Sequence, residues 1–427
     1  MVNSNDSGLP PLVCATAGSV DDGKSTLLGR LLFDAKALMS DQIEHVAEVS
    51  KRRGLQRTDL ALLTDGLRAE REQGITIDVA WRYFATPRRR FVLADSPGHV
   101  QYTRNMVTAA SHADVAIILV DVRRGVTEQT RRHLFVARLL GVPSITVAIN
   151  KMDQVSFSFE AFSRVREDVA RYVDAIDVPR LPSRLTFIPV SALHGDNVVD
   201  PSMAMPWYDG PALLAHLEGQ AKAGDAGQAG VRFAVQATLR PQSDSHPDFR
   251  GYAGRLSSGT LSVGDAVRVL PAGHASRVES IYWGGEPVAE ACAGQSIVVC
   301  LADQLDVGRG DLFVGSGAVP PRVTTELVAD VAWMNATEAR VGTPYVLKAG
   351  TREVRAFIEQ VETRYDVSSG RGIAHDGLGL GLNDLARIRL RTSTPIAIDS
   401  YRDVRGTGSF LLVSPVTSET VGAGMVT

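Results

Sequence analysis

The stretch CATAGSVDDGKSTLLGRLL, residues 14–32, joins an apolar run to a helical pattern through a glycine-rich loop. Its centre, Gly18 to Ser25, matches the pattern G-x-x-x-x-G-K-[ST]. In such a loop the glycines let backbone N–H groups wrap phosphate oxygens, and the helix that follows presents its N-terminus to the same anion. A purely structural loop is the alternative, but the order strand, loop, helix is the context that this motif requires. We therefore predict a phosphate-binding loop in which Lys24 reaches the β- and γ-phosphates and the Ser25 hydroxyl binds Mg²⁺.

Composition limits the class of protein. The chain has 427 residues, of which 44% are hydrophobic, and a formal net charge of −3. This length predicts two or three domains, and the balanced charge does not favour a nucleic-acid-binding protein. No apolar run approaches the roughly 20 residues of a membrane span, and the N-terminal segment lacks the order of a signal peptide. We expect a cytoplasmic protein with no membrane partner. The three cysteines, Cys14, Cys292 and Cys300, show no metal-ligand spacing and are expected to be structural.

Apolar strand patterns alternate with helical patterns in the first half of the chain. The helical patterns cover residues 101–113, 128–140 and 159–176. Near-continuous apolar strands that alternate with helices indicate a parallel sheet covered on both faces. We therefore predict an α/β P-loop domain with a mostly parallel, doubly wound sheet over residues 1–217. The predicted strands are LVCATAG (12–18), RFVLADSPG (90–98), DVAIILVDV (114–122), SITVAINKMD (144–153) and RLTFIPVSAL (184–193).

A different pattern follows in the second half. Residues 218–230, EGQAKAGDAGQAG, are small and polar, which predicts a flexible linker. Beyond it, short strands of alternating polarity are separated by turn residues, as is typical of β-barrels. We predict two small antiparallel β-barrels over residues 231–318 and 319–427, with the boundary placed by the turn-rich segment GSGAVPPR.

The segment LADSPGH, residues 93–99, supplies a second element of the site. Asp95 ends an apolar strand, where a carboxylate can hold Mg²⁺ directly or through water. Gly98 would let a backbone N–H group approach the γ-phosphate. Such a segment is also typical of ordinary turns, and its distance after the phosphate loop is what favours a functional role. A lone histidine is usually structural, but the position of His99 directly after Gly98 favours a role in orienting the attacking water.

The segment AINKMD, residues 148–153, predicts the base. An Asn150 side chain can bond purine O6 or N7, while the Asp153 carboxylate can accept from N1–H and the exocyclic amine. Guanine alone offers both donors, so the predicted nucleotide is GTP. Lys151 would lie along the ring face; only six of the 45 basic residues are lysines, which makes a lysine in a motif harder to attribute to background. Read alone, N-K-x-D is also a strand-ending turn, and its order after the other motifs favours the base-binding interpretation.

A fourth segment, VSAL at residues 190–193, follows the next predicted strand and suits a backbone N–H donor from Ala192 to guanine O6. Together the motifs define one predicted nucleotide site. The residues expected to contact GTP are Gly18, Ser19, Val20, Asp21, Asp22, Gly23, Lys24, Ser25, Thr26, Asp95, Ser96, Pro97, Gly98, His99, Asn150, Lys151, Met152, Asp153, Ser191, Ala192 and Leu193. Ser25 and Asp95 are the expected Mg²⁺ ligands, and Lys24 and His99 the expected catalytic groups.

The order of these motifs, followed by two barrels, resembles the translational GTPases of the elongation factor Tu and 1-alpha type. The sequence within and around these motifs resembles the GTPase (large) subunit of bacterial sulfate adenylyltransferase. This resemblance extends through nearly the whole chain and is most specific in the first domain. The stretches that carry this resemblance include GSVDDGKSTLLGRLL, AEREQGITID, DSPGH, QYTRNMVTAAS and GTGSFLLVSPVTSETVGAGM. It implies that Thr76, in GITID, offers its hydroxyl to Mg²⁺ as a third metal ligand and catalytic group. The charged segment that contains Thr76, residues 65–78, would form a loop that is ordered by GTP and released on hydrolysis, although its charges alone favour an ordinary solvated helix.

The resemblance also implies a partner and a coupled reaction. In that family a smaller catalytic subunit, bound as a heterodimer or higher heteromer, joins ATP and sulfate into adenosine 5′-phosphosulfate and pyrophosphate. GTP hydrolysis on this chain would drive that unfavourable step. Two residues beside His99 depart from the common family pattern: Val100 stands where Glu is common, and Ser96 where Thr is common.

Two other functions fit the same GTP site. An elongation-factor-like GTPase that binds aminoacyl-tRNA would carry basic stripes on its barrels, but the second half of the chain shows only scattered arginines. A regulatory GTPase with no coupled chemistry remains open at this point. The sequence analysis favours the GTPase subunit of a sulfate adenylyltransferase, with GTP and Mg²⁺ as cofactors and no nucleic-acid partner.

Overall fold

The computed structural model describes residues 10–37, 40–52, 60–63, 79–96, 103–178, 183–221, 230–241, 249–317, 319–374 and 379–427. The chain divides into two compact units. The first comprises Met1–Ala223 with Asp366–Gly372, and the second comprises Gly224–Tyr365 with Ile373–Thr427. Within the described ranges, no helix combines the length and apolarity needed to cross a membrane.

The first unit is built on a six-stranded sheet in the order β2-β3-β1-β4-β5-β6. Neighbouring strands from β3 to β6 run parallel, and β2 runs antiparallel to β3 at the edge. Every residue of β4 and β5 is buried, as expected for strands covered on both faces. The strands are β1 (Leu12–Gly18), β2 (Ala80–Ala85), β3 (Arg90–Asp95), β4 (Val115–Asp121), β5 (Ser144–Asn150) and β6 (Arg184–Pro189).

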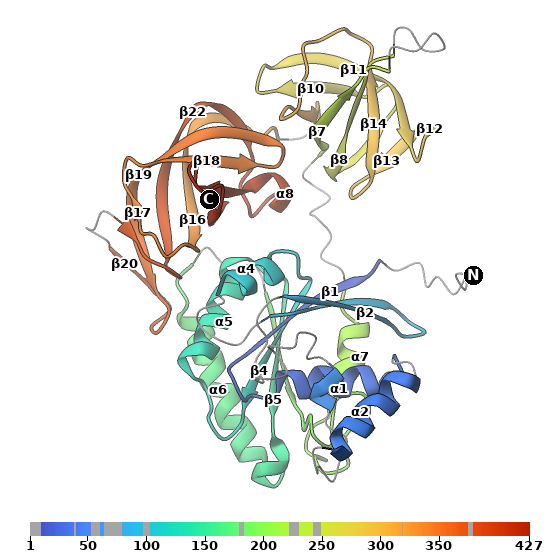
Figure 1. Ribbon diagram of the computed structural model, residues 1–427, viewed down its shortest axis with the longest axis vertical. Coiled ribbons are helices and arrows are strands. Elements are labelled where there is room, and N and C mark those ends of the chain that lie inside the picture. The colour runs from blue at the N-terminus through green and yellow to red at the C-terminus, as the bar shows by residue number, and fades with distance from the viewer. Residues whose placement is uncertain are drawn as a thin grey trace. The chain divides into compact units, whose positions relative to one another are not determined.

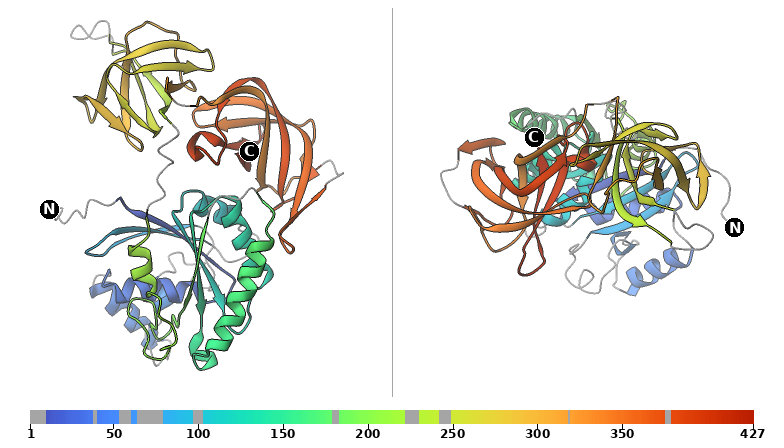
Figure 2. Two further views of the ribbon diagram at one scale, coloured as in Figure 1. Left: turned by 180° about the vertical axis from the view of Figure 1, so that it is seen from behind. Right: turned by 90° about the horizontal axis from the view of Figure 1, so that it is seen from above.

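Helices cover both faces of this sheet, as Figure 1 and the rear view in Figure 2 show. On one side lie α1 (Lys24–Asp34), α2 (Ser40–Arg52) and α7 (Leu213–Glu218). On the other lie α4 (Thr103–Ser111), α5 (Glu128–Leu139) and α6 (Phe159–Ala175). Apolar side chains of α1 and α7 share one core with those of β1, β3 and β4. Because the strands from β3 to β6 run parallel, their carboxyl ends all lie at the same end of the sheet, which is where α/β sheets bind ligands.

The second unit contains a first closed barrel of six antiparallel strands. The order β10-β15-β7-β8-β14-β11 closes because β10 also pairs with β11, and β12 extends the sheet beyond β11. Its interior is filled by side chains such as Phe233, Tyr252 and Phe313. The strands are β7 (Arg232–Leu239), β8 (Gly251–Ser258), β10 (Ala266–Leu270), β11 (His274–Trp283), β12 (Glu286–Val288), β14 (Ser296–Leu301) and β15 (Leu312–Gly315), with β9 (Thr260–Ser262) and β13 (Glu290–Cys292) forming a separate pair.

A second closed barrel follows in the same unit. The order β18-β23-β24-β16-β22-β19 closes through β18 and β19, and β20 extends from β19. Its core is made by residues such as Trp333, Tyr345, Ile388 and Phe410. The strands are β16 (Arg322–Trp333), β18 (Pro344–Ala349), β19 (Arg352–Asp366), β20 (Arg371–Ala374), β22 (Leu385–Ile398), β23 (Ser409–Val413) and β24 (Thr420–Val426), with β17 (Ala339–Arg340) and β21 (Gly379–Leu380) forming a separate pair and the short α8 (Arg405–Gly408) preceding β23.

The predicted fold class is confirmed: a mostly parallel α/β domain is followed by two antiparallel barrels. The five predicted buried strands correspond to β1, β3, β4, β5 and β6, although four of the predicted runs extend beyond the carboxyl end of the observed strand. The half-exposed edge strand β2 and the helices α2 and α7 were not among the predicted elements. The domain limits at 217, 230 and 318 stay predictions.

Candidate nucleotide site

The phosphate loop connects β1 to α1 at the carboxyl edge of the sheet. Gly23 caps α1 with a left-handed backbone, at φ 90°. A Cβ atom at Gly23 would lie 2.5 Å from the side-chain nitrogen of Asn150, so both the backbone angle and the neighbour require glycine. Lys24 begins the helix, whose N-terminal N–H groups therefore face the loop.

Asp22 holds the loop from inside. Its Oδ2 accepts a hydrogen bond from the Ser19 backbone N–H at 2.8 Å. Only 1% of the residue is exposed, and its Oδ1 has no hydrogen-bond partner among the described residues. Burial raises the pKa of Asp22 to about 6, although the Ser19 bond and the charge of Arg124 oppose this rise. The loop thus contains a carboxylate whose ionisation is costly.

Lys24 and Asp95 meet below the loop. The Lys24 ammonium lies 2.6 Å from Asp95 Oδ1, and both side chains are buried. The Thr16 hydroxyl also donates to Asp95 Oδ1, at 3.1 Å. Ser96 is fully buried, and its hydroxyl donates to the Thr16 carbonyl at 2.5 Å. The pairing of β1 with β3 therefore brings together two motifs that lie about seventy residues apart, as predicted.

Asn150 joins three predicted motifs at one point. Its Nδ2 donates to the Asp22 carbonyl in the phosphate loop at 2.8 Å. Its Oδ1 accepts from the Ala192 backbone N–H at 3.0 Å. Sequence reasoning assigned both groups to the guanine base, whereas the structure uses them to tie loops together. Asn150 is therefore a positioning residue for the loop that carries Ala192.

Lys151 connects the base motif to the end of β4. Its backbone is left-handed, and its ammonium donates to the Asp21 carbonyl and lies 3.0 Å from Asp121 Oδ2. Arg123 donates two hydrogen bonds to the same carboxylate, from Nε to Oδ1 at 3.0 Å and from Nη2 to Oδ2 at 2.6 Å. Burial alone would raise the pKa of Asp121, but the bonds from Arg123 and Lys151 lower it to about 2. Asp121 is thus ionised throughout the physiological range and anchors the Lys151 head group.

Asp153 is held with its carboxylate beside the VSAL loop. Its Oδ1 accepts from the Ser191 hydroxyl at 2.7 Å, and its Oδ2 accepts from Gln154 at 2.6 Å. Burial alone would raise the pKa of Asp153, but these hydrogen bonds lower it below its ordinary value. An ionised acceptor in this place has the charge needed to bind the N–H donors of a guanine.

The N-terminus of α5 adds residues that the sequence analysis did not find. Thr127 caps this helix by accepting from the Thr130 N–H, and its hydroxyl also lies 2.9 Å from that of Ser19 in the phosphate loop. His133, one turn further along, is 1% exposed. Burial, aided by the nearby charge of Lys24, lowers the pKa of His133 to about 3, so this side chain is neutral. The capping signal TEQT was visible in the sequence, but its contact with Ser19 was not.

The remaining predicted residues divide into three groups. Ser25, Thr26 and Val20 lie in the loop and first turn of α1, with Val20 38% exposed. Met152 is fully buried, and the Leu193 carbonyl accepts from Arg30 at 2.8 Å. Thr76, Pro97, Gly98 and His99, together with Val100, lie outside the described residues. Asp121, Arg123, Thr127 and His133 are the neighbours of the site that sequence reasoning missed.

The donor set suits a magnesium ion bound together with phosphates. Asp95 supplies a buried carboxylate and Ser25 a hydroxyl, and oxygen ligands are those that Mg²⁺ prefers. Among the described residues, no group of three His, Cys, Asp or Glu side chains forms a metal cage of the protein alone. A carboxylate and a hydroxyl of the protein are ligands that Mg²⁺ commonly combines with substrate phosphates and water.

Comparison with known proteins adds a family relationship. Residues 10–238 match the Elongation factor Tu GTP binding domain family, and residues 326–427 match the GTP-eEF1A C-terminal domain-like family. The bifunctional enzyme CysN/CysC of Mycobacterium tuberculosis (strain CDC 1551 / Oshkosh) is 51% identical over 96% of this chain and 66% of its own length. Sulfate adenylyltransferase subunit 1 of Aeromonas salmonicida (strain A449) is 45% identical over 96% of this chain and 85% of its own. The corresponding subunit 1 of Laribacter hongkongensis (strain HLHK9) is 44% identical over 96% of this chain and 84% of its own length. The chain thus spans about two thirds of the length of the bifunctional relative.

Proposed function

Because the chain belongs to the family of sulfate adenylyltransferase subunit 1 and carries an elongation factor Tu type GTP-binding domain, we propose that it couples GTP hydrolysis to sulfate activation. The partner would be a smaller catalytic subunit that makes adenosine 5′-phosphosulfate and pyrophosphate from ATP and sulfate. The two would form a heterodimer or a higher heteromer in the cytoplasm. The sulfate chemistry would take place on the partner.

One observation supports the GTP site above all: Asn150 ties the phosphate loop to the loop of Ala192 through both ends of its amide. Asp153 and Ser191, which are bonded to each other, belong to the two segments that Asn150 joins, and this supports a base site next to the loop that would hold the phosphates. In the proposed complex the loop N–H groups and the N-terminus of α1 bind the phosphates. The Asp153 carboxylate reads the guanine edge, and Lys151, anchored by Asp121, lies along the ring.

Lys24 and Asp95 supply the charges around the reacting phosphate. The Lys24 ammonium neutralises negative charge on the phosphate oxygens, and Asp95 with Ser25 would hold Mg²⁺. When bound, Mg²⁺ supplies a positive charge that stabilises the developing charge on the phosphates. His99 would orient the attacking water and Thr76 would complete the metal site; both residues belong to the proposal.

Coupling follows from the energy of the product. A phosphosulfate anhydride is high in energy, so its formation needs a favourable step that is linked to it. A ligand shifts a conformational equilibrium by as much as it differs in affinity for the two states. A loop that is ordered around the γ-phosphate and released on hydrolysis would provide two such states. The partner would then be biased toward product formation in one of them.

Replacement Asp153→Asn tests the base assignment. The amide would present a donor to the guanine N1–H, so GTP binding should weaken by about tenfold to hundredfold, the value of one charged hydrogen bond. Xanthosine triphosphate, which has a carbonyl in place of the amine, should bind better than it does to the wild type. Titration with both nucleotides measures this; unaltered GTP affinity would contradict the base assignment.

Replacement His99→Ala tests the hydrolytic role. We expect GTP turnover to fall by about a hundredfold or more, in the range of a lost general catalyst, with GTP affinity retained. Single-turnover hydrolysis and a binding titration separate the two effects. Unchanged turnover would remove His99 from the mechanism.

Coupled synthesis tests the whole proposal. The chain is purified with its candidate small subunit, and pyrophosphate release from ATP is measured with and without sulfate and GTP. We expect release to require sulfate and to be stimulated by GTP, and the stimulation to disappear with the Lys24→Ala variant. Release that needs neither sulfate nor GTP would contradict the sulfate-activation function.

A further inference from the structure

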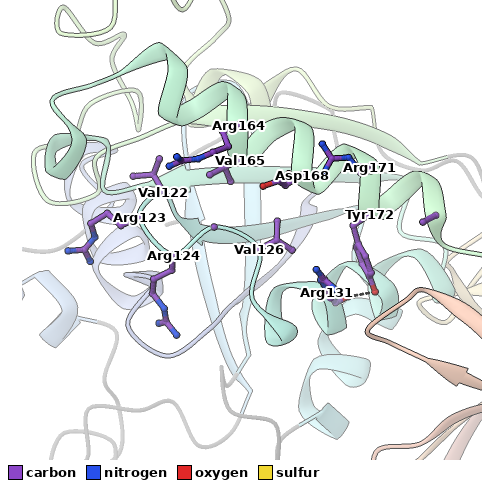
Figure 3. A pocket seen from close by; sticks show the side chains of 12 residues that line it. Val122, Arg123, Arg124, Val126, Arg131, Arg164, Val165, Asp168, Arg171 and Tyr172 are labelled. Atoms are coloured by element: carbon purple, nitrogen blue, oxygen red, sulfur yellow. Dashed lines mark hydrogen bonds and ion pairs between the residues drawn. The ribbon is translucent and has the colours of Figure 1, made fainter.

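A basic cavity of about 650 Å³ lies on the first unit, between the β4–α5 loop, α5 and α6. Five arginines and one carboxylate line it, so the lining carries an excess of positive charge. Figure 3 shows Arg123 and Arg124 on the loop at one end, and Arg131 beside Tyr172 at the other. Arg164 and Arg171 stand along the wall between them, on α6. We call this cavity the arginine pocket.

The α6 wall presents its charges in a regular row. Arg164, Asp168 and Arg171 are spaced four and then three residues apart, so they share one face of the helix. Within the described part of the chain, the Arg164 guanidinium has neither a hydrogen-bond nor an ion-pair partner. Arg171 pairs with Asp168 at 3.0 Å, but both side chains are exposed, by 76% and 44%, and such a pair contributes little. Two guanidinium groups on this wall are therefore ready to bind an anion.

The loop end of the pocket is bonded to the nucleotide site. Arg124 donates to the Val20 carbonyl in the phosphate loop at 2.9 Å. Arg123 holds Asp121, the carboxylate that also anchors Lys151. An anion that drew these two arginines toward the pocket would loosen contacts on both the phosphate loop and the base motif.

The opposite end is closed by contacts within the same compact unit. Arg131 donates to the Ser368 carbonyl at 2.7 Å, and the Tyr172 hydroxyl donates to the Val367 carbonyl at 2.5 Å. Arg131 and Tyr172 therefore stabilise the pocket wall, and their bonds to backbone carbonyls leave ligand binding to the other arginines. The binding charges are thus Arg164 and Arg171 on the wall, with Arg123 and Arg124 at the loop end.

The geometry points to the arginine pocket as the docking site for an acidic peptide segment of a partner protein, whose binding speeds nucleotide release. The Cα atoms of Arg164 and Arg171 are separated by about 10 Å along the helix axis, from the rise of 1.5 Å per residue, a spacing that favours two acidic groups over a single phosphate or sulfate. An extended peptide presents every second side chain on one side, about 7 Å apart, and the length of the glutamate and arginine side chains bridges the difference from the roughly 10 Å between the two arginines. Arginine clusters are a recurrent means of binding acidic motifs.

A peptide assay tests this without the partner. The probe is a short fluorescein-labelled oligoglutamate peptide, and its binding to the full chain is followed by fluorescence anisotropy at low and moderate salt. We expect binding that weakens with salt, and about tenfold weaker binding by the double variant Arg164→Glu with Arg171→Glu. The matched control is Arg52→Glu with Arg88→Glu, which changes the net charge equally at two exposed arginines of the same unit. The control should bind the peptide within about twofold of the wild type.

A second readout measures the link to the nucleotide. We expect the peptide to speed the release of fluorescent GDP from the wild type and from the control, but not from the Arg164/Arg171 variant. Equal peptide binding by the two double variants, no binding by the wild type, or unchanged GDP release in the wild type would each overturn the proposal. A further competition tests whether the pocket prefers a small anion. If pyrophosphate or ATP displaced the labelled peptide, while sodium chloride of the same ionic strength left it bound, the pocket would be a site for a small anion and the peptide proposal would be overturned. The inference rests on the proposed function only for the identity of the partner that supplies the acidic segment. The peptide assay contains neither the partner nor sulfate, so a negative result in this assay is distinct from a negative result in the coupled synthesis.

Discussion

At the scale of single residues, the phosphate loop contains an acid in an unusual state. Asp22 accepts the Ser19 N–H and is nearly excluded from water, so burial raises its pKa to about 6. The bond to Ser19 shapes the loop, while the buried charge costs stability. Sequence reasoning placed Asp22 in the loop only as a ligand contact. Its structural role arises because the side chain turns inward, and one oxygen there lacks a hydrogen-bond partner among the described residues.

Replacement Asp22→Asn isolates this cost. The ordinary pKa of the carboxyl, 3.8, is raised to about 6 on folding, so the folded state binds the proton more tightly. The contribution of Asp22 to the free energy of unfolding therefore falls as pH rises from about 4 to about 6, and the cost is complete above pH 6. Two pKa units correspond to about 3 kcal/mol at most.

We therefore expect the nucleotide-free Asp22→Asn variant to match the wild type near pH 4, to exceed its stability increasingly up to about pH 6, and to keep that advantage at pH 7. Urea unfolding at several pH values measures the difference. The exposed neighbour Asp21 provides the control, since Asp21→Asn removes a negative charge from the same loop that is not buried. A difference that does not change with pH would show that the Asp22 charge carries no folding cost.

At the scale of elements, the N-terminus of α5 supports the phosphate loop. The helix begins after Thr127, whose hydroxyl accepts from the Thr130 N–H and contacts the Ser19 hydroxyl. One residue thus caps a helix and touches the loop expected to hold phosphates. The neighbouring helix α6 is capped in the same way by Ser158, which accepts from the Ala161 N–H at 3.2 Å. The two caps differ in that the Thr127 hydroxyl also contacts the phosphate loop, through Ser19.

Replacements Thr127→Ala and Ser158→Ala form a matched pair. Each should lower the free energy of unfolding by about 1 kcal/mol, the usual value of an N-cap side chain. Only Thr127→Ala should also weaken GTP binding, because Ser19 loses its contact. Chemical unfolding and a GTP titration measure the two effects. Equal GTP affinities in the two variants would show that the Ser19 contact does not shape the loop.

At the scale of the whole molecule, each unit contains a buried ion pair, which in the first unit is formed by Lys24 and Asp95. In the second unit a buried ion pair joins β7 to the residue after β22: the Arg232 guanidinium binds Asp399 at 2.9 and 3.0 Å. Arg232 is 2% exposed and also donates to the Val319 carbonyl, while Asp399 accepts from Thr407. Removing one partner would leave the other charge buried, which costs more than the pair itself contributes.

Replacement Arg232→Met should therefore destabilise the second unit by about 3–5 kcal/mol, whereas Arg232→Met with Asp399→Leu should recover most of this loss. The half-exposed pair of Arg389 and Glu362 is the control, and Arg389→Ala should cost about 1 kcal/mol or less. Thermal unfolding of the wild type and of these three variants measures the series. A double variant as unstable as Arg232→Met would show that the pair contributes through packing rather than through charge.

Much of the fold and of the predicted site followed from local patterns. The strands β1, β3, β4, β5 and β6 are recognisable because residues buried on both faces must be apolar in a continuous run. The edge strand β2 was not predicted because it is six residues long and alternates exposed residues with residues that are mostly only partly buried. The phosphate loop and the NKMD segment were recognisable because their chemistry depends on residues that are adjacent in sequence.

The sequence by itself determined the α/β and barrel classes, the family and the motifs expected to bind GTP, since each depends on the order of neighbouring residues. The tertiary structure alone decided that Asn150 bonds to Asp22 and Ala192, and that Asp121 anchors Lys151. It also gathered arginines of one loop and two helices around a single pocket. The reason is that these contacts join segments brought together only when parallel strands align at one edge and the helices pack beside them, and no local pattern specifies which side chains then meet.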